Sequence, residues 1–97
     1  MLNSKHRQVT RAPDVLVQDL EGEAVLLNLA NGQYYGLDET SYDMYKTLVS
    51  SSSFQAAHET LCQEYEVNPD QLRADLDQFL NHLLENGLLI YADEQSE

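Results

Sequence analysis

Short runs rich in apolar residues, bounded by turn residues, occupy the first third of the chain, and apolar residues recur with a helical period in the rest. Three segments, Val15–Leu20, Glu23–Leu29 and Gln33–Leu37, are runs of strand-forming residues. Glu21-Gly22 and Asn31-Gly32 separate them as short turns. The pattern therefore predicts a three-stranded antiparallel meander with Gln33–Leu37 at one edge.

The second hairpin has the stronger turn signal. Asn-Gly favours a two-residue type I′ loop because both residues tolerate positive φ angles, and such a loop would place Leu29 opposite Tyr34 and Leu26 opposite Leu37. Because side chains alternate along a strand, Val25, Leu27, Leu29 and Tyr34 would share one face, and Leu26, Asn28, Tyr35 and Leu37 the other. Neither face is polar, and helices readily cover only one. The excess apolar surface indicates a binding surface.

Helical spacing begins after Asp38. The pattern predicts one helix over Glu39–Val49, a second carrying Phe54, Ala57, Leu61 and Tyr65, and a third that begins at Pro69 and stops at Gly87. Asp38, the last residue of the serine run 50–53, and Asn68 are the expected N-caps, and Gly87 has the position of a C′ glycine. The apolar stripe over Leu72–Leu84 is wider than one contact surface needs.

The order of elements is three strands followed by three helices, which predicts an α+β fold of the winged helix-turn-helix type. We expect one domain over residues 13–91, a polar N-terminal tail over residues 1–12 and an acidic C-terminal tail over residues 92–97. Leu88–Tyr91 is expected to return to an extended conformation.

Charge narrows the classes of partner. The 97 residues include 17 acidic and 5 basic side chains, a formal net charge of -12. Such a field repels phosphate backbones, so we expect no nucleic-acid partner. A cationic peptide or protein is the better electrostatic match.

The cysteine content and the lengths of the apolar runs indicate the cellular compartment of the protein. Cys62 is the single cysteine, so no internal disulfide can form, which fits a reducing compartment. No apolar run approaches the roughly 18 residues of a spanning helix, and no signal-peptide pattern is present. We expect a soluble, cytoplasmic protein without a membrane partner.

Residues with catalytic chemistry are scattered. His6, His58 and His82 show no metal-ligand spacing and are expected to be surface histidines. Cys62 has no evident base to activate it, and the glycines form no phosphate-binding loop. The sequence predicts no catalytic residue, no metal site and no cofactor, and so no enzyme.

One stretch resembles a known family. It contains EAVLLNL at Glu23–Leu29, NGQYYGLD at Asn31–Asp38, then Met44-Tyr45 and Leu48. It is similar to the PqqD-like family, winged-helix peptide-binding domains called RiPP recognition elements, which act on ribosomally synthesised precursor peptides. Asp38 and Tyr45 depart from the Asn and Trp that family members often carry.

The resemblance extends over nearly the whole chain. RAPDVLV at Arg11–Val17 resembles the first strand of the family, and Leu83–Leu89 resembles the end of its C-terminal helix. The sequence NGQYYGL at Asn31–Leu37 is more similar to that of the free-standing recognition proteins of lasso-peptide pathways than to that of the pyrroloquinoline quinone chaperone.

The resemblance implies a peptide-binding site. The leader segment of a precursor would add as a strand to the edge of Gln33–Leu37 and lie against the third helix, a form of β-augmentation. The implied contacts are Gln33, Tyr34, Tyr35, Gly36, Leu37, Leu72, Asp75, Leu76, Phe79 and Leu80. For Leu76, Phe79 and Leu80, a purely structural role in the core has about equal weight.

The resemblance also implies enzyme partners: a leader peptidase, acting with a cyclase or another modifying enzyme. One alternative is a pyrroloquinoline quinone-type peptide chaperone for a radical enzyme. Another is a winged-helix DNA-binding regulator. The last is disfavoured because the second and third helices carry many acids and only Arg73 as a fixed cation.

Overall fold

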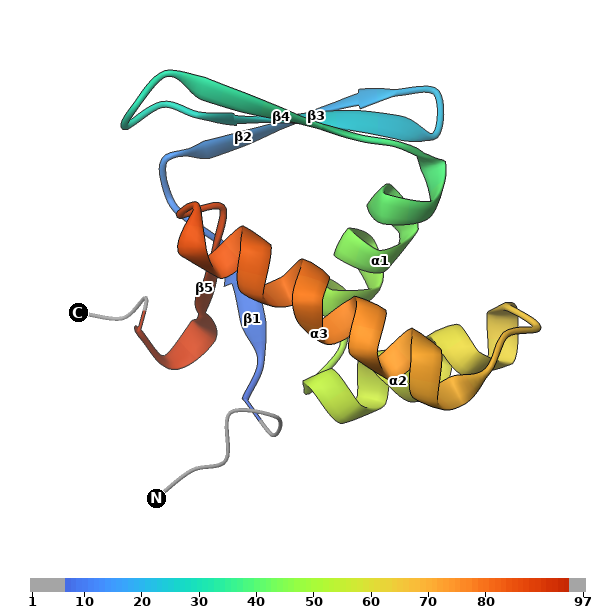
Figure 1. The fold of residues 1–97 in the computed structure, drawn as a ribbon. Coiled ribbons are helices and arrows are strands. Elements are labelled where there is room, and N and C mark those ends of the chain that lie inside the picture. The colour runs from blue at the N-terminus through green and yellow to red at the C-terminus, as the bar shows by residue number, and fades with distance from the viewer. Residues whose placement is uncertain (1–6, 95–97) are drawn as a thin grey trace.

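The computed structural model describes residues 7–94 and shows an α+β fold (Figure 1). Its strands are β1 (Val9–Arg11), β2 (Val15–Leu20), β3 (Glu23–Asn28), β4 (Gln33–Leu37) and β5 (Leu89–Tyr91). Its helices are α1 (Glu39–Ser50), α2 (Phe54–Glu64), α3 (Pro69–Glu85) and a final 3-10 turn (Ala92–Glu94). The three long helices and the three strands of the meander lie within one or two residues of their predicted bounds.

The strands form two sheets. The meander is a three-stranded antiparallel sheet in the order β2-β3-β4, and β1 pairs with β5 in a separate two-stranded ribbon. Figure 1 shows the meander as one layer, with the helices and the β1–β5 ribbon on one side of it. One face of the meander therefore packs on the core, while its other face is left without a covering element among the described residues.

Strand β1 differs from the prediction of an N-terminal tail over residues 1–12. Val9 pairs with Tyr91 and Arg11 with Leu89, and Val9 is buried at 3% exposure. A three-residue strand has too little alternation to stand out in the sequence, and its partner lies at the other end of the chain. Residues 1–6 of the predicted N-terminal tail and residues 95–97 of the predicted C-terminal tail lie outside the described residues.

The predicted two-residue loop at Asn31-Gly32 is wrong. Asn28 pairs with Gln33 and Leu27 with Tyr34, so the loop has four residues, 29–32, and the register is shifted by two from the prediction. Among the described residues, Glu21 is the one non-glycine with positive φ, so Asn31 cannot complete a type I′ turn. Because the shift is even, each side chain stays on its predicted face.

The first hairpin has the tight turn instead. Leu20 pairs with Glu23 across Glu21 and Gly22, whose φ angles are 60° and 98°. Two consecutive positive φ angles are those of a type I′ loop. This hairpin, which pairs Leu16 with Leu27 and Val17 with Leu26, agrees with the predicted short turn at Glu21-Gly22.

All three predicted N-caps are confirmed. Asp38 accepts a hydrogen bond from the Ser41 N–H, Ser53 from the Ala56 N–H, and Asn68 from the Asp70 and Gln71 N–H groups. Each cap satisfies backbone donors that the first helical turn leaves open, which stabilises the start of the helix. The backbone hydrogen bond from Ser41 also holds the pKa of the Asp38 carboxyl below its ordinary value.

Gly87 ends α3 as predicted. Its φ is 71°, its N–H donates to Leu84 and the Leu88 N–H donates to Leu83, which together form a Schellman motif. A Cβ at this position would lie 3.3 Å from Asn28 Nδ2. This turn directs Leu88 and Leu89 into the core and β5 toward β1.

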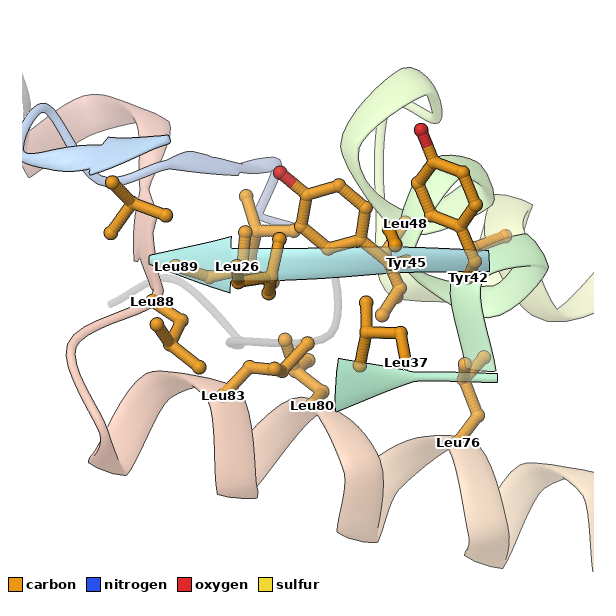
Figure 2. Close-up of a cluster of buried hydrophobic side chains, with 14 of the residues drawn as sticks. Leu26, Leu37, Tyr42, Tyr45, Leu48, Leu76, Leu80, Leu83, Leu88 and Leu89 are labelled. Carbon is orange, nitrogen blue, oxygen red and sulfur yellow. The ribbon is translucent and has the colours of Figure 1, made fainter. Parts of the chain in front are cut away.

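The core lies between the meander and the helices. Leu26 and Leu37 project from the sheet, and Leu76, Leu80 and Leu83 project from α3 toward them (Figure 2). Other fully buried members are Val15, Ala57, Leu61, Leu88 and Leu89. Since α3 presents these leucines to the sheet, it is held beside β4, where the candidate site lies.

Candidate functional site

Strand β4 has a free edge. Among the described residues it pairs with β3 on one side and with no strand on the other. The backbone N–H and C=O groups on that edge are therefore open to an added strand. Tyr34 on β4 is 74% exposed, although burial of an aromatic ring is energetically favourable.

One flank of α3 runs beside this edge. Leu76, Leu80 and Leu83 face the core, and a second row lies next to them along the helix. We call this row the flanking stripe; it consists of Leu72, Asp75, Phe79, His82 and Asn86, spaced three or four residues apart. Leu72 and Phe79 are half-buried against the core, and Asp75 is exposed.

Tyr35 joins β4 to the flanking stripe. Its hydroxyl lies 3.1 Å from Asn86 Oδ1 and 2.8 Å from Gln33 Oε1, and its ring meets the His82 ring edge to face at 6.2 Å between centroids. The single hydroxyl proton can serve one acceptor at a time. Tyr35 therefore closes one end of the space between β4 and α3.

A pocket of about 230 Å³ lies at the other end of the stripe. It is formed where the first turns of α1, directly after β4, face the first turns of α3. Its lining is mostly apolar. It consists of Thr40, Met44, Leu61, Tyr65, Val67, Gln71, Leu72 and Asp75. At Asp75, Oδ1 accepts a hydrogen bond of 2.9 Å from Gln71 Nε2. The pocket can hold an apolar side chain of leucine size.

One wall of the pocket is fixed by a hydrogen bond between helices. The Tyr65 hydroxyl at the end of α2 donates to Asp43 Oδ2 of α1 at 2.5 Å. This bond stabilises the protonated phenol beside a carboxylate and raises the pKa of Tyr65 from 10.0 to about 12.

Tyr65→Phe is expected to lower the free energy of unfolding by about 1 kcal/mol at neutral pH, because it removes this hydrogen bond. The pKa of Tyr65 is higher in the folded than in the unfolded chain, so the stabilisation is complete below pH 10 and is lost as the pH rises toward about 12. Urea titrations of both proteins from pH 7 to 11.5 should show the difference shrinking above pH 10. In Asp43→Asn, tyrosinate absorbance should show Tyr65 ionising nearer its ordinary value; an unchanged titration would contradict this assignment.

The predicted site residues divide into three groups. Gln33, Tyr34 and Gly36 are exposed along β4. Tyr35 contacts Asn86 and His82 of the flanking stripe, and Leu72, Asp75 and Phe79 belong to the same stripe, with Leu72 and Asp75 lining the pocket. The remaining three, Leu37, Leu76 and Leu80, are buried at 7%, 0% and 5% exposure. All three are therefore core residues in this structure. For Leu76 and Leu80 this is the structural role that the sequence left open.

Several residues of this site were not predicted from the sequence. His82 and Asn86 lie three and seven residues after Phe79, so helical spacing from Phe79 could have found them. Met44 and Tyr65 have the spacing of core residues in their own helices, and no local signal separates a pocket wall from a core.

The histidine prediction is wrong for His58, which is buried at 8% exposure with its Nε2 2.8 Å from the Pro69 carbonyl oxygen. Cys62 is half-buried, with its Sγ 3.5 Å from the same histidine nitrogen. Across residues 7–94 no three His, Cys, Asp or Glu residues are grouped so as to hold a metal ion. None of the helices described is long and apolar enough to cross a membrane.

The described residues thus combine an open sheet edge with a helix and an apolar pocket near it, which are features that peptide recognition by strand addition uses. The family model for coenzyme PQQ synthesis protein D (PqqD) matches residues 23–89. The chain therefore belongs to the PqqD family, as its resemblance implies.

Two solved structures are similar to this chain over most of both lengths. One is TbiB1 in complex with the TbiA(beta) leader peptide, at 29% identity and a TM-score of 0.76, covering 82% of this chain and 93% of that one. The other is lasso peptide synthetase B1 complexed with the leader peptide, at 25% identity and a TM-score of 0.77, covering 86% and 98%. Among curated proteins, no sequence matches the chain.

Proposed function

We propose that this protein is a RiPP recognition element that binds the leader segment of a ribosomally synthesised precursor peptide of the lasso type. The observation that carries the proposal is the free edge of β4 next to the flanking stripe and the apolar pocket. Similarity to two leader-bound proteins supports it. We assign the fold to the winged helix-turn-helix type, in which α2 and α3 form the helix-turn-helix and the meander forms the wing.

The leader binds as a fourth strand on β4. Backbone hydrogen bonds to the free edge supply affinity, and alternate leader side chains enter the space beside the flanking stripe. An apolar leader residue fills the pocket next to Leu72, and Phe79 packs on the leader between the pocket and Tyr35. Leu37, Leu76 and Leu80 support this surface from the core.

The protein acts without catalysis. It presents the bound leader to a leader peptidase and, with it, to a cyclase or other modifying enzyme. Because the precursor is made on ribosomes, this binding takes place in the cytoplasm. Binding needs no cofactor, since backbone pairing and side-chain burial are sufficient for affinity.

A pyrroloquinoline quinone-type chaperone is the second candidate, favoured by the family model that matches the chain. It uses the same strand addition and differs in its client peptide. DNA binding is disfavoured because α3 carries Asp70, Asp75, Asp77 and Glu85 against Arg73.

Calorimetric titration with two synthetic leaders tests the proposal and separates its candidates. One leader is that of TbiA(beta), the peptide found in complex with the similar TbiB1, and the other is from a pyrroloquinoline quinone precursor. We expect saturable binding of the first and at least tenfold weaker binding of the second. Binding of neither leader would refute the proposal, and tighter binding of the second would favour the chaperone.

Asp75→Asn is expected to slow leader association and to reduce its dependence on salt. With a net charge of -12, the protein attracts a basic leader over long range, and added salt screens this attraction mainly before contact. Asp75 is an exposed acid at the pocket rim. Stopped-flow fluorescence with a labelled leader at two salt concentrations measures both effects.

Asp77→Asn is the matched control for Asp75→Asn. It removes the same charge from the same helix, but a rotation of about 200° separates the two positions. Both variants lose one unit of charge, so an equal loss of association rate in both would show that net charge acts alone and that Asp75 has no special place.

A further inference from the structure

Hydrogen-bond acceptors gather where β4 meets the end of α3. The Tyr35 hydroxyl lies 2.8 Å from Gln33 Oε1 and 3.1 Å from Asn86 Oδ1, and it has one proton for these two oxygens. We call Gln33, Tyr35, His82 and Asn86 the acceptor cluster. Tyr35 and Asn86 are half-buried, so water satisfies their oxygens less readily than those of an open surface.

The donors of Asn86 are directed toward its own helix. Its Nδ2 donates to the His82 carbonyl oxygen at 2.8 Å and lies 3.4 Å from His82 Nδ1, and its backbone N–H donates to the carbonyl oxygens of His82 and Leu84. The amide thus points Oδ1, its acceptor, toward Tyr35. One of the two side-chain oxygens beside the Tyr35 hydroxyl is therefore left without the hydroxyl proton.

The electrostatics of this end of α3 favour a positive charge. The last turn of a helix is the negative end of its dipole, and the one basic residue in the last turn of α3 is His82. Glu85 is exposed and directly precedes Asn86. On the side of the sheet, residues 12–45 include seven acidic residues and no Lys, Arg or His.

The cations of the chain itself are engaged by other groups. Within residues 7–94, the Lys and Arg side chains contact Asp93, the Val15 carbonyl oxygen, the Tyr42 ring and Gln55. An ammonium or guanidinium group carries several N–H donors and no acceptor. A cationic side chain from outside the chain would therefore supply both the donors that the acceptor cluster lacks and the charge that the end of α3 favours.

We propose that the acceptor cluster is a subsite for a Lys or Arg side chain of the leader. This inference rests on the proposed function, and it adds a polar requirement to the apolar one at the pocket. Leu72 of the pocket and Asn86 of the acceptor cluster are 14 positions apart on α3, which is about 21 Å along a helix. An extended leader covers this length in about six residues. The leader therefore carries an apolar residue and a cation at about that separation.

The first test scans a synthetic leader with paired substitutions. Each position of the leader of TbiA(beta), the peptide in complex with TbiB1, is replaced in turn by Lys and by Gln, and calorimetric titration gives the affinity of each peptide. We expect one position at which Lys binds about fivefold tighter than Gln, the upper end of what an exposed charged contact gives. At the remaining positions Lys should have only the small, uniform advantage that the net charge of the protein supplies.

Two protein variants test whether that advantage comes from the acceptor cluster. Asn86→Ala removes Oδ1, and Glu85→Gln removes a charge from the exposed end of α3, so each should reduce the Lys advantage at that position. Asp77→Asn is the matched control: it removes the same charge about 12 Å earlier along the helix and should keep the advantage. A Lys advantage of equal size at every position, or one that persists in both Asn86→Ala and Glu85→Gln, would overturn the proposal.

A titration without leader keeps the subsite testable if the proposed function fails. Ethylammonium has three N–H donors, whereas tetramethylammonium has the same charge and no donor. In amide NMR spectra, we expect ethylammonium to shift the side-chain signals of Asn86 at concentrations at which tetramethylammonium leaves them unchanged. Absence of leader binding would refute the proposed function, and identical responses to the two cations would then refute the subsite as well.

Discussion

Leader binding is expected to be abolished by proline in β4, at Tyr35 or at Gly36. In an antiparallel sheet, the N–H groups of adjacent residues point to opposite edges. One of the two variants therefore removes a donor from the free edge, and the other removes a hydrogen bond to β3. The free-edge variant should stay folded and lose leader binding altogether, as measured by calorimetric titration together with thermal unfolding.

Gly36→Ala is the matched control for the proline pair. It keeps the backbone N–H, and its Cβ meets nothing within 4 Å, so it should bind leader as the wild type does. Unchanged affinity in both proline variants, with both folded, would show that the leader does not pair with β4.

Truncation of Phe79 is expected to weaken leader binding by about 2 kcal/mol, a factor of roughly thirty. Phe79 is half-buried in the flanking stripe and packs against the core. Phe79→Ala should therefore also lower the thermal midpoint, and affinity must be measured well below that midpoint. Calorimetric titration at about 15 °C measures the loss of leader affinity separately from the loss of thermal stability.

Leu84→Ala provides the comparison for Phe79→Ala. Leu84 is also half-buried against the core on α3, but it lies on the flank away from the stripe. It should lose stability to a similar degree and keep its affinity for leader. Equal losses of affinity in the two variants would show that Phe79 acts through folding alone.

The sequence by itself determined the local structure of this protein. Runs of strand-forming residues between turn residues located the three strands of the meander, and helical spacing located α1, α2 and α3. Asp38, Ser53, Asn68 and Gly87 were identified as helix ends because capping depends on residues within one turn of each other. The order of strands in a meander follows from short connections, so the free edge of β4 was also predictable.

The tertiary structure decided what depends on residues far apart in the chain. Strand β1 is stabilised by β5, about eighty positions away, and three residues alone carry no signal of that pairing. The loop at Asn31-Gly32 has four residues, although its dipeptide favours two. Asn28 Oδ1 accepts a hydrogen bond from the Ala30 N–H in this loop, and Asn28 Nδ2 donates to the carbonyl oxygen of Asn86, the C-cap residue of α3.

The division of α3 into core and site was also a tertiary outcome. Local periodicity shows that Leu72, Leu76, Phe79 and Leu80 share one broad side of a helix. Packing against Leu26 and Leu37 decides which of them are buried, and the contact of Tyr35 with His82 and Asn86 decides which flank faces β4. Helical spacing defines a stripe by angle, but only the neighbouring element determines whether that stripe meets the core, a ligand or water.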